Sequence, residues 1–151
     1  MKLFQSASHT LKKYFDFKGR ASRSEFWYFF FFVLLVQAVA RLIDAMLGVG
    51  FYLPGPVSAL AGLLLFIPQL AVAVRRLHDV GRSGRDLVVP CVMLLLLPIV
   101  LLLGGFLSRI VALGYAGVTL LLFAHLLTLL TKKGAAVPNR YGGNPEAFSF
   151  G

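Results

Sequence analysis

Two long runs of uncharged residues occupy the second half of the chain. Asp86 and Arg109 are separated by 22 residues, and Arg109 and Lys132 by another 22. Because a helix rises about 1.5 Å per residue, each run extends about 33 Å, enough to cross a hydrocarbon core about 30 Å thick. The pattern therefore predicts transmembrane helices over about 87–107 and 110–131.

The first half of the chain predicts two more spans. Residues 45–74 also carry no charge, but 48–56 are rich in glycine and proline, which is typical of a loop. A helix over about 57–74 remains, and the apolar stretch before the loop predicts a first span over about 26–47. That first run is too long for the apolar core of a signal peptide, so we expect no cleaved signal.

The approach to the first span carries a helix-start signal. Ser22-Arg23-Ser24-Glu25 fits a capping box, with Ser22 as the N-cap and Glu25 reaching back to it. Trp27 and Tyr28 follow, where the aromatic belt of a membrane protein is expected. The preceding stretch, 3–17, mixes lysines with large apolar residues. It either lies along the cytoplasmic headgroups or is a disordered lead-in.

The composition excludes a soluble protein. Of the 151 residues, 58% are hydrophobic and only 14% are charged, whereas soluble domains have roughly 25% charged residues. A chain of 16.5 kDa with a mean hydropathy of +0.82 cannot bury that much apolar surface and keep a polar exterior. We predict one domain, 1–151, that is an all-α integral membrane protein, an antiparallel bundle of four transmembrane helices. The single cysteine, Cys91, excludes an intramolecular disulfide, and we expect neither a metal nor a cofactor.

The basic residues predict the orientation. The formal net charge is +9, and 13 of the 15 Lys and Arg lie on one side of a four-span chain, with Arg41 and Arg109 on the other. The positive-inside rule then places both termini and the loop after the second span in the cytoplasm. So placed, the positive charge favours anionic phospholipids as partners, and not nucleic acid.

Four polar residues are predicted to be buried within the spans. Arg41 and Asp44 share a helix face near the outer interface, either as an ion pair with a snorkelling arginine or as charges lining a transport path. Gln69 and His125 are expected at similar depth in the second and fourth spans. They either hydrogen-bond to pack these helices or form a proton or substrate relay.

Three cytoplasmic segments, 17–27, 75–86 and 139–145, lie on one face of such a bundle. If the second span continues by one turn, the arginines, His78 and Asp79 of the middle segment share one side of the helix. Clustered guanidinium groups can hold a phosphate; alternatively, they are topological charges that contact lipid. The candidate headgroup-binding residues are Arg20, Arg23, Arg75, Arg76 and Arg82.

The order of residues in these segments resembles a known family. Phe-x-Gly-Arg-x-Ser-Arg-x-Glu-Phe-Trp is followed by Arg-Arg-Leu-His-Asp-x-Gly-x-Ser-Gly and then by Asn-x-Tyr-Gly-x-x-Pro. This pattern, from about Tyr14 to Pro145, is similar to the bacterial inner-membrane family known as domain of unknown function 805. The resemblance implies a small multi-span protein of the bacterial cytoplasmic membrane, with no established activity.

The resemblance also singles out individual positions on the cytoplasmic face. These are Gly19, Arg20, Arg23, Glu25, Trp27, Arg75, Arg76, His78, Asp79, Gly81, Gly84, Asn139, Tyr141, Gly142 and Pro145. The chain departs from the pattern at Arg85-Asp86, where an aromatic residue is expected.

Three functions are compatible with these features. We favour a non-enzymatic module whose arginine-rich cytoplasmic face binds anionic lipid headgroups or a protein partner, possible partners including a second copy of the chain. The alternative is a small oligomeric transporter or lipid-handling protein, which would use the polar residues within the spans. A third is an enzyme acting on a lipid phosphate, with His78 as base or nucleophile and the arginines as a clamp.

Overall fold

The computed structural model describes residues 2–49, 54–102, 106–143 and 145. Five helices follow one another in these ranges: α1 (Lys2–Lys12), α2 (Arg23–Met46), α3 (Pro56–Asp79), α4 (Arg85–Leu102) and α5 (Phe106–Thr131). The all-α prediction is confirmed, and each predicted span overlaps one of the helices α2 to α5. Residues 103–105, near the end of the span predicted over 87–107, lie outside the described residues.

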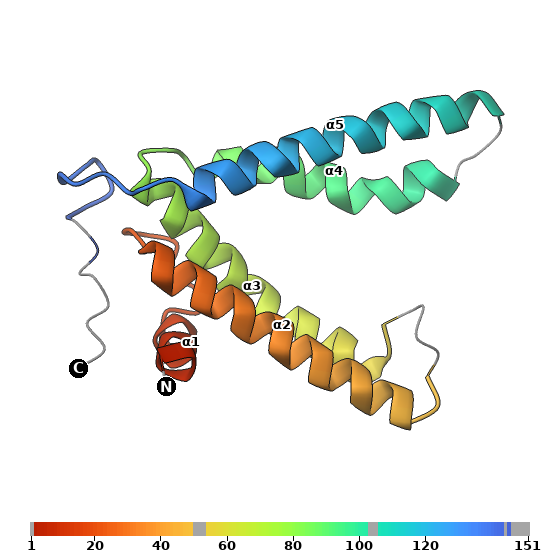
Figure 1. Ribbon diagram of the computed structural model, residues 1–151, viewed down its shortest axis with the longest axis horizontal. Helices are drawn as coiled ribbons and strands as arrows, with labels where there is room; N and C mark the ends of the chain where they lie inside the picture. The colour runs from red at the N-terminus through yellow and green to blue at the C-terminus, as the bar shows by residue number, and fades with distance from the viewer. Residues whose placement is uncertain (1, 50–53, 103–105, 144, 146–151) are drawn as a thin grey trace.

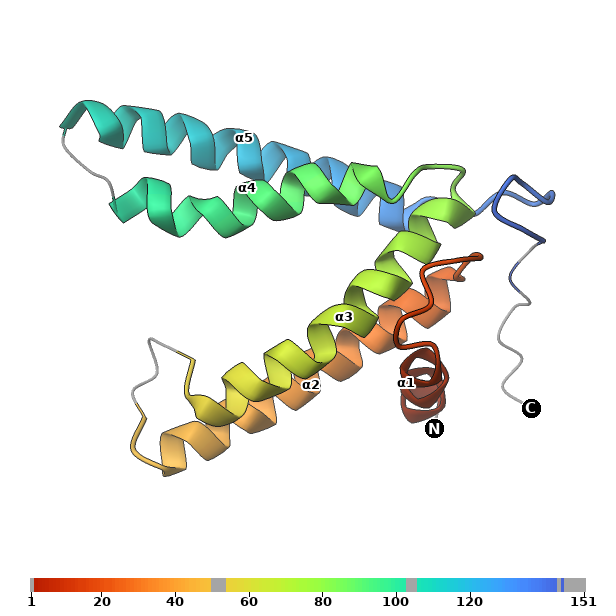
Figure 2. The same cartoon turned by 180° about the vertical axis from the view of Figure 1, so that it is seen from behind.

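The four long helices form two hairpins and not one closed bundle. Helix α2 packs along α3, and α4 packs along α5. The two hairpins diverge from the turn between α3 and α4, so that the chain has the shape of a V (Figures 1 and 2). The predicted four-helix bundle is therefore not confirmed.

Among the residues that the structure describes, three helices are long and apolar enough to cross a membrane: α2, α3 and the Ile110–Thr131 part of α5. In each of these helices, only 17% to 28% of an 18-residue apolar stretch is buried inside the protein. Large apolar side chains such as Leu63, Leu95 and Leu121 are exposed on the outside of the hairpins. Apolar surface of this extent is typical of a protein whose surroundings are lipid.

Helix α1 lies across the α2–α3 hairpin near the vertex of the V (Figure 2). Its inner face is made of small residues, because Ser6, Ala7 and Thr10 are buried, and the Ser6 hydroxyl donates to the Glu25 carbonyl. Phe4 is partly exposed, and its ring makes an edge-on contact with Phe32 of α2 at 6.2 Å between the centroids. The alternative of a disordered lead-in is therefore wrong for this part of the chain.

The apolar core lies where α1, α2, α3 and α5 approach one another. Phe29 of α2 and Val72 and Leu77 of α3 are fully buried there, together with Leu126 and Leu130 of α5. The predicted N-cap is confirmed, because the Ser22 hydroxyl accepts a hydrogen bond from the Glu25 backbone N–H at 3.1 Å. The core thus lies beside the three segments that carry the sequence motifs.

Asp44 closes the other end of the first hairpin. Its carboxylate accepts hydrogen bonds from the backbone N–H groups of Val57 and Ser58, at 3.0 and 2.9 Å, and so caps the N-terminus of α3. A side chain on Gly55 would collide with this carboxylate. The prediction that Asp44 is buried is confirmed, and its neighbour Arg41 is half-buried.

Candidate functional site

Three segments that are distant in sequence meet at the vertex of the V (Figure 1). They are the loop before α2, the C-terminal end of α3 and the segment that follows α5. Five buried charged side chains lie at this meeting point: Arg20, Glu25, Arg75, Arg76 and Asp79. We refer to these five residues as the ionic cluster.

Asp79 is the centre of the ionic cluster. Its Oδ1 atom accepts a hydrogen bond from Arg20 Nε at 2.9 Å and lies 2.8 Å from Arg20 Nη2. Its Oδ2 atom accepts from Arg76 Nη1. Its backbone carbonyl accepts from the Ala135 N–H at 2.9 Å, which attaches the segment after α5 directly to the end of α3.

The two arginines bound to Asp79 also hold the segment after α5. Arg76 donates to the carbonyls of Leu130 and Lys132, so it satisfies the C-terminal carbonyls of α5. Arg20 donates to three carbonyls further along, those of Ala135, Val137 and Gly142. A side chain on Gly134 would collide with the Asp79 carboxylate, so glycine is needed for this close approach.

A second ion pair connects α1, α2 and α3. Arg75 Nη1 donates to Glu25 Oε1 at 3.0 Å, and both side chains are almost completely buried. His9 Nδ1 of α1 lies 3.5 Å from the same carboxylate oxygen. Burial lowers the pKa of His9, and Lys13 and Arg75 act in the same direction, against the opposing effect of Glu25.

His78 stacks on Tyr141. The ring centroids are 3.8 Å apart and the ring planes are nearly parallel, at 4°. His78 Nδ1 lies 3.1 Å from the Gly19 carbonyl, and Asn139 Nδ2 donates to the His78 carbonyl at 2.8 Å. His78 therefore contacts all three motif segments.

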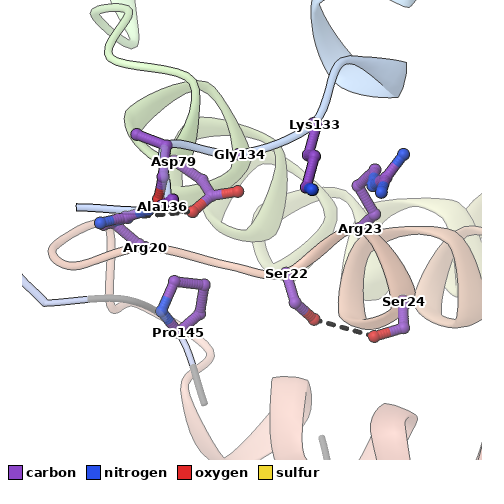
Figure 3. Close-up of a pocket in the computed structure, with 10 residues that line it drawn as sticks. Arg20, Ser22, Arg23, Ser24, Asp79, Lys133, Gly134, Ala136 and Pro145 are labelled. Atoms are coloured by element: carbon purple, nitrogen blue, oxygen red, sulfur yellow. Dashed lines mark hydrogen bonds and ion pairs between the residues drawn. The ribbon is translucent and has the colours of Figure 1, made fainter. Parts of the chain in front are cut away.

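Beside the ionic cluster lies an open hollow of about 730 Å³ (Figure 3). Ser22, Arg23 and Ser24 line it from the start of α2, and Lys133 lines it from the segment after α5. The side chains of Arg23 and Lys133 are exposed and lie on the same side of the hollow in Figure 3. Arg20 and Asp79 line its inner side.

Electrostatics make this hollow positive. The ionic cluster contains three arginines and two carboxylates, which leaves one positive charge. Arg23 and Lys133 add one each at the rim. Because α2 begins at Arg23, the positive end of its helix dipole also lies at the hollow. The arrangement suits a phosphate or another anion.

The structure changes the assignment of the predicted headgroup-binding arginines. Arg20, Arg75 and Arg76 are 8%, 1% and 0% exposed and bind carboxylates and backbone carbonyls of the protein itself. They therefore have a structural role, and of the three Arg20 also lines the hollow. Arg23 and Arg82 are exposed. Arg82 lies beyond the end of α3 and so does not share the helix face that was expected for it.

The remaining motif residues are mostly structural. Gly19, Gly81 and Gly142 have positive φ angles, which favours glycine because it has no Cβ. A Cβ on Gly84 would lie 2.9 Å from a Val74 methyl group, so glycine lets α3 and α4 approach closely. Two further motif residues are Trp27, which packs edge-on against Phe26, and Pro145, which lines the hollow.

Gln69 and His125 do not form the pair that was expected. Gln69 is half-buried, and its Oε1 atom has no hydrogen-bond partner among the described residues. His125 is exposed on the surface of α5, so it does not pack against Gln69 between the helices. The physical reason is the divergence of the hairpins: α5 packs against α4 and moves away from α3 (Figure 1).

Sequence reasoning missed two residues of the site, His9 and Lys133. His9 lies in the stretch 3–17, for which the sequence allows two interpretations. A histidine flanked by Ser and Thr gives no local signal that it will lie beside a distant glutamate. Lys133 was counted only as one of the topological charges. Its position directly after the last apolar run, opposite the helix start at Arg23, is the signal that could have identified it.

Comparison with known proteins places these motifs in a family. The family model described as "Protein of unknown function (DUF805)" matches residues 14–143. The chain is 45% identical over 75 residues to the inner membrane protein YhaI of Escherichia coli (strain K12), covering 49% of this chain and 60% of YhaI. It is 42% identical over 77 residues to YhaH of the same strain, covering 49% of this chain and 62% of YhaH. The chain thus matches less than two thirds of these relatives' length, and no solved structure matches it significantly.

Proposed function

Because this chain belongs to the DUF805 family, we propose that it is a non-enzymatic inner-membrane protein whose basic cytoplasmic face binds anionic phospholipid headgroups. The observation that carries the proposal is the positive hollow between the start of α2 and the segment after α5, with Arg23 and Lys133 at its rim. The names of the relatives YhaI and YhaH, which are inner membrane proteins, support the location.

The proposed arrangement in the membrane has four spans. Helices α2, α3, α4 and α5 each cross once, and both termini and the turn between α3 and α4 lie in the cytoplasm, as the distribution of Lys and Arg favours. The vertex of the V then lies at the cytoplasmic surface. Trp27, one turn into α2 from Arg23, is a residue type typical of that interface, so the hollow lies at the level of the lipid phosphates.

The ionic cluster supports this role indirectly. A shallow site binds an anion more tightly when its residues are already ordered, because binding then costs less conformational entropy. Asp79, Arg20 and Arg76 connect the loop before α2 to the segment after α5 before any ligand arrives. Arg23 and Lys133 are therefore held beside each other at the rim of the hollow without a lipid.

The test neutralises the rim of the hollow. Purified Arg23→Gln/Lys133→Gln protein is titrated with phosphatidylglycerol in a neutral detergent, and retained lipid is counted by native mass spectrometry. Each basic residue near an anionic lipid surface contributes about 1 kcal/mol, so the loss of both is expected to weaken retention about thirtyfold. Phosphatidylcholine, which has no net charge, is expected to be retained poorly by both proteins.

A matched control removes the same charge elsewhere on the same face. Lys132 and Arg140 are exposed and do not line the hollow, so Lys132→Gln/Arg140→Gln is expected to retain phosphatidylglycerol almost as the unchanged protein does. Equal losses in the two double variants would show that net charge alone attracts the lipid, and the hollow would then not be a site.

A further inference from the structure

A second hollow lies between α3 and α4 and shares no lining residue with the first. It is a groove of about 250 Å³ with almost entirely apolar walls. The side chains that define this groove are Phe17, Leu70, Val74, Val88, Cys91 and Val92. It exists because α3 and α4 touch closely at Gly84 and diverge beyond it (Figure 2).

The groove follows the helices. Leu70 and Val74 are one turn apart on α3, as are Val88 and Val92 on α4, so its walls extend along the helix axes. In the proposed arrangement these axes cross the membrane, and the groove opens toward the hydrocarbon core. An elongated apolar ligand parallel to the lipids is the shape that fits.

The cytoplasmic end of the groove is basic. Lys18 follows Phe17, and Arg85 follows Gly84, and both side chains are exposed. Arg82 is also exposed and lies 4.0 Å from Asp86, the one acidic residue of this turn. Asp16, which precedes Phe17, is exposed as well and accepts a hydrogen bond from the Lys18 backbone N–H. Three positive and two negative charges therefore lie beside this end of the groove, and the remaining positive charge complements a molecule with an anionic head and an apolar tail.

We propose that this groove binds one acyl chain of an anionic phospholipid, whose phosphate lies among Lys18, Arg82 and Arg85. This inference rests on the proposed crossing of the membrane by α4. It is independent of headgroup binding in the first hollow, because the two sites have different residues. The bound lipid fills the space at which the two hairpins separate and so acts as a structural ligand of the V.

Cys91 provides a direct test, because it is the single cysteine of the chain and lines the groove. Its modification by N-ethylmaleimide in a neutral detergent is followed by intact mass while phosphatidylglycerol is added. We expect a saturable slowing of about fivefold, since a groove occupied four fifths of the time reacts at one fifth of the open rate. Phosphatidylcholine is expected to need a much higher concentration.

A thiol outside the groove controls for lipid in the micelle. Leu121 is 71% exposed on α5, so the thiol of Cys91→Ser/Leu121→Cys reports general shielding and is expected to change little. Equal slowing of both thiols would overturn the proposal. Slowing of Cys91 that depends on protein concentration and not on lipid would also overturn it, because the occupant would then be a second copy of the chain.

Filling the groove is a second test. Val88 and Val89 are adjacent on α4 and are 54% and 55% exposed, but Val88 lines the groove and Val89 does not. Val88→Phe is expected to lose one phosphatidylglycerol in native mass spectrometry, whereas Val89→Phe keeps it; equal retention overturns the proposal. Arg23→Gln/Lys133→Gln is expected to leave the protection of Cys91 by lipid unchanged. The proposal of headgroup binding in the first hollow and the proposal of acyl-chain binding in the groove can therefore be rejected separately.

Discussion

Asp79 connects the three motif segments through a single side chain and its own backbone. The carboxylate binds Arg20 from the loop before α2 and Arg76 from α3. The carbonyl binds Ala135 from the segment after α5. A buried ion pair adds little to stability compared with apolar packing, but removal of one partner leaves an uncompensated buried charge. The cluster therefore specifies one arrangement of the three segments.

Replacement of Asp79 by Asn keeps the shape of the side chain and removes its charge. Two buried arginines then lose their counter-charge, and we expect the free energy of unfolding to fall by about 3–5 kcal/mol. The midpoint of denaturant unfolding in detergent measures this. Asp86→Asn is the matched control: Asp86 is half-exposed and 4.0 Å from Arg82, so its loss is expected to cost about 0–1 kcal/mol. Similar midpoints for the two variants would contradict a central role for Asp79.

At the scale of the elements, α1 is attached by the edge-on contact of Phe4 with Phe32, by Ala7 in the core and by a few polar contacts. Ser6 bonds to the Glu25 carbonyl, and His9 lies against the Glu25–Arg75 pair. The inner face of α1 consists of small residues and buries little apolar area. The attachment of α1 therefore depends on the charge state of the groups at this contact.

The docking of α1 is expected to weaken in acid. The pKa of His9 is lowered from 6.5, mainly by burial, so near and below pH 6.5 the unfolded chain binds more protons than the folded one and stability falls as the pH falls. The thermal midpoint of the protein should decrease between pH 7.5 and pH 5.5. His9→Gln should reduce this slope, whereas His125→Gln, on the exposed face of α5, should keep it. An unchanged slope in His9→Gln would contradict the prediction.

The positions of the helices could be predicted because charges interrupt the apolar runs. Asp86 and Lys132, which bound two of those runs, lie within one or two residues of the ends of α4 and α5. The role of Arg75 and Arg76 could not be predicted in the same way. Their partners Glu25 and the Leu130 carbonyl are 50 and 54 residues away, and no local pattern distinguishes a buried arginine from one that contacts lipid.

At the scale of the whole molecule, the sequence could not decide between one bundle and two hairpins. Helices α4 and α5 have apolar residues on nearly every side, so no stripe marks the face that packs against a neighbour. The meeting of the three motif segments, in contrast, was predictable, since a hairpin of two helices of similar length returns the chain to the end at which it began. His78 and Tyr141 meet there across 63 positions.

The orientation of the V is the property on which both proposed lipid sites depend, and it is tested by single cysteines in a Cys91→Ser background. The positive-inside rule predicts that cysteines at Ser8, Ser83 and Arg140 lie in the cytoplasm, and that those at Leu47 and Ser108 lie outside. A membrane-impermeant maleimide applied to intact bacterial spheroplasts should label the second group and reach the first only after lysis. Leu47 tests the α2–α3 hairpin and Ser108 the α4–α5 hairpin, so each half of the V is read separately. Labelling of Ser108 from the cytoplasmic side alone would show that α4 does not cross, and the acyl-chain groove would then have no hydrocarbon to open into.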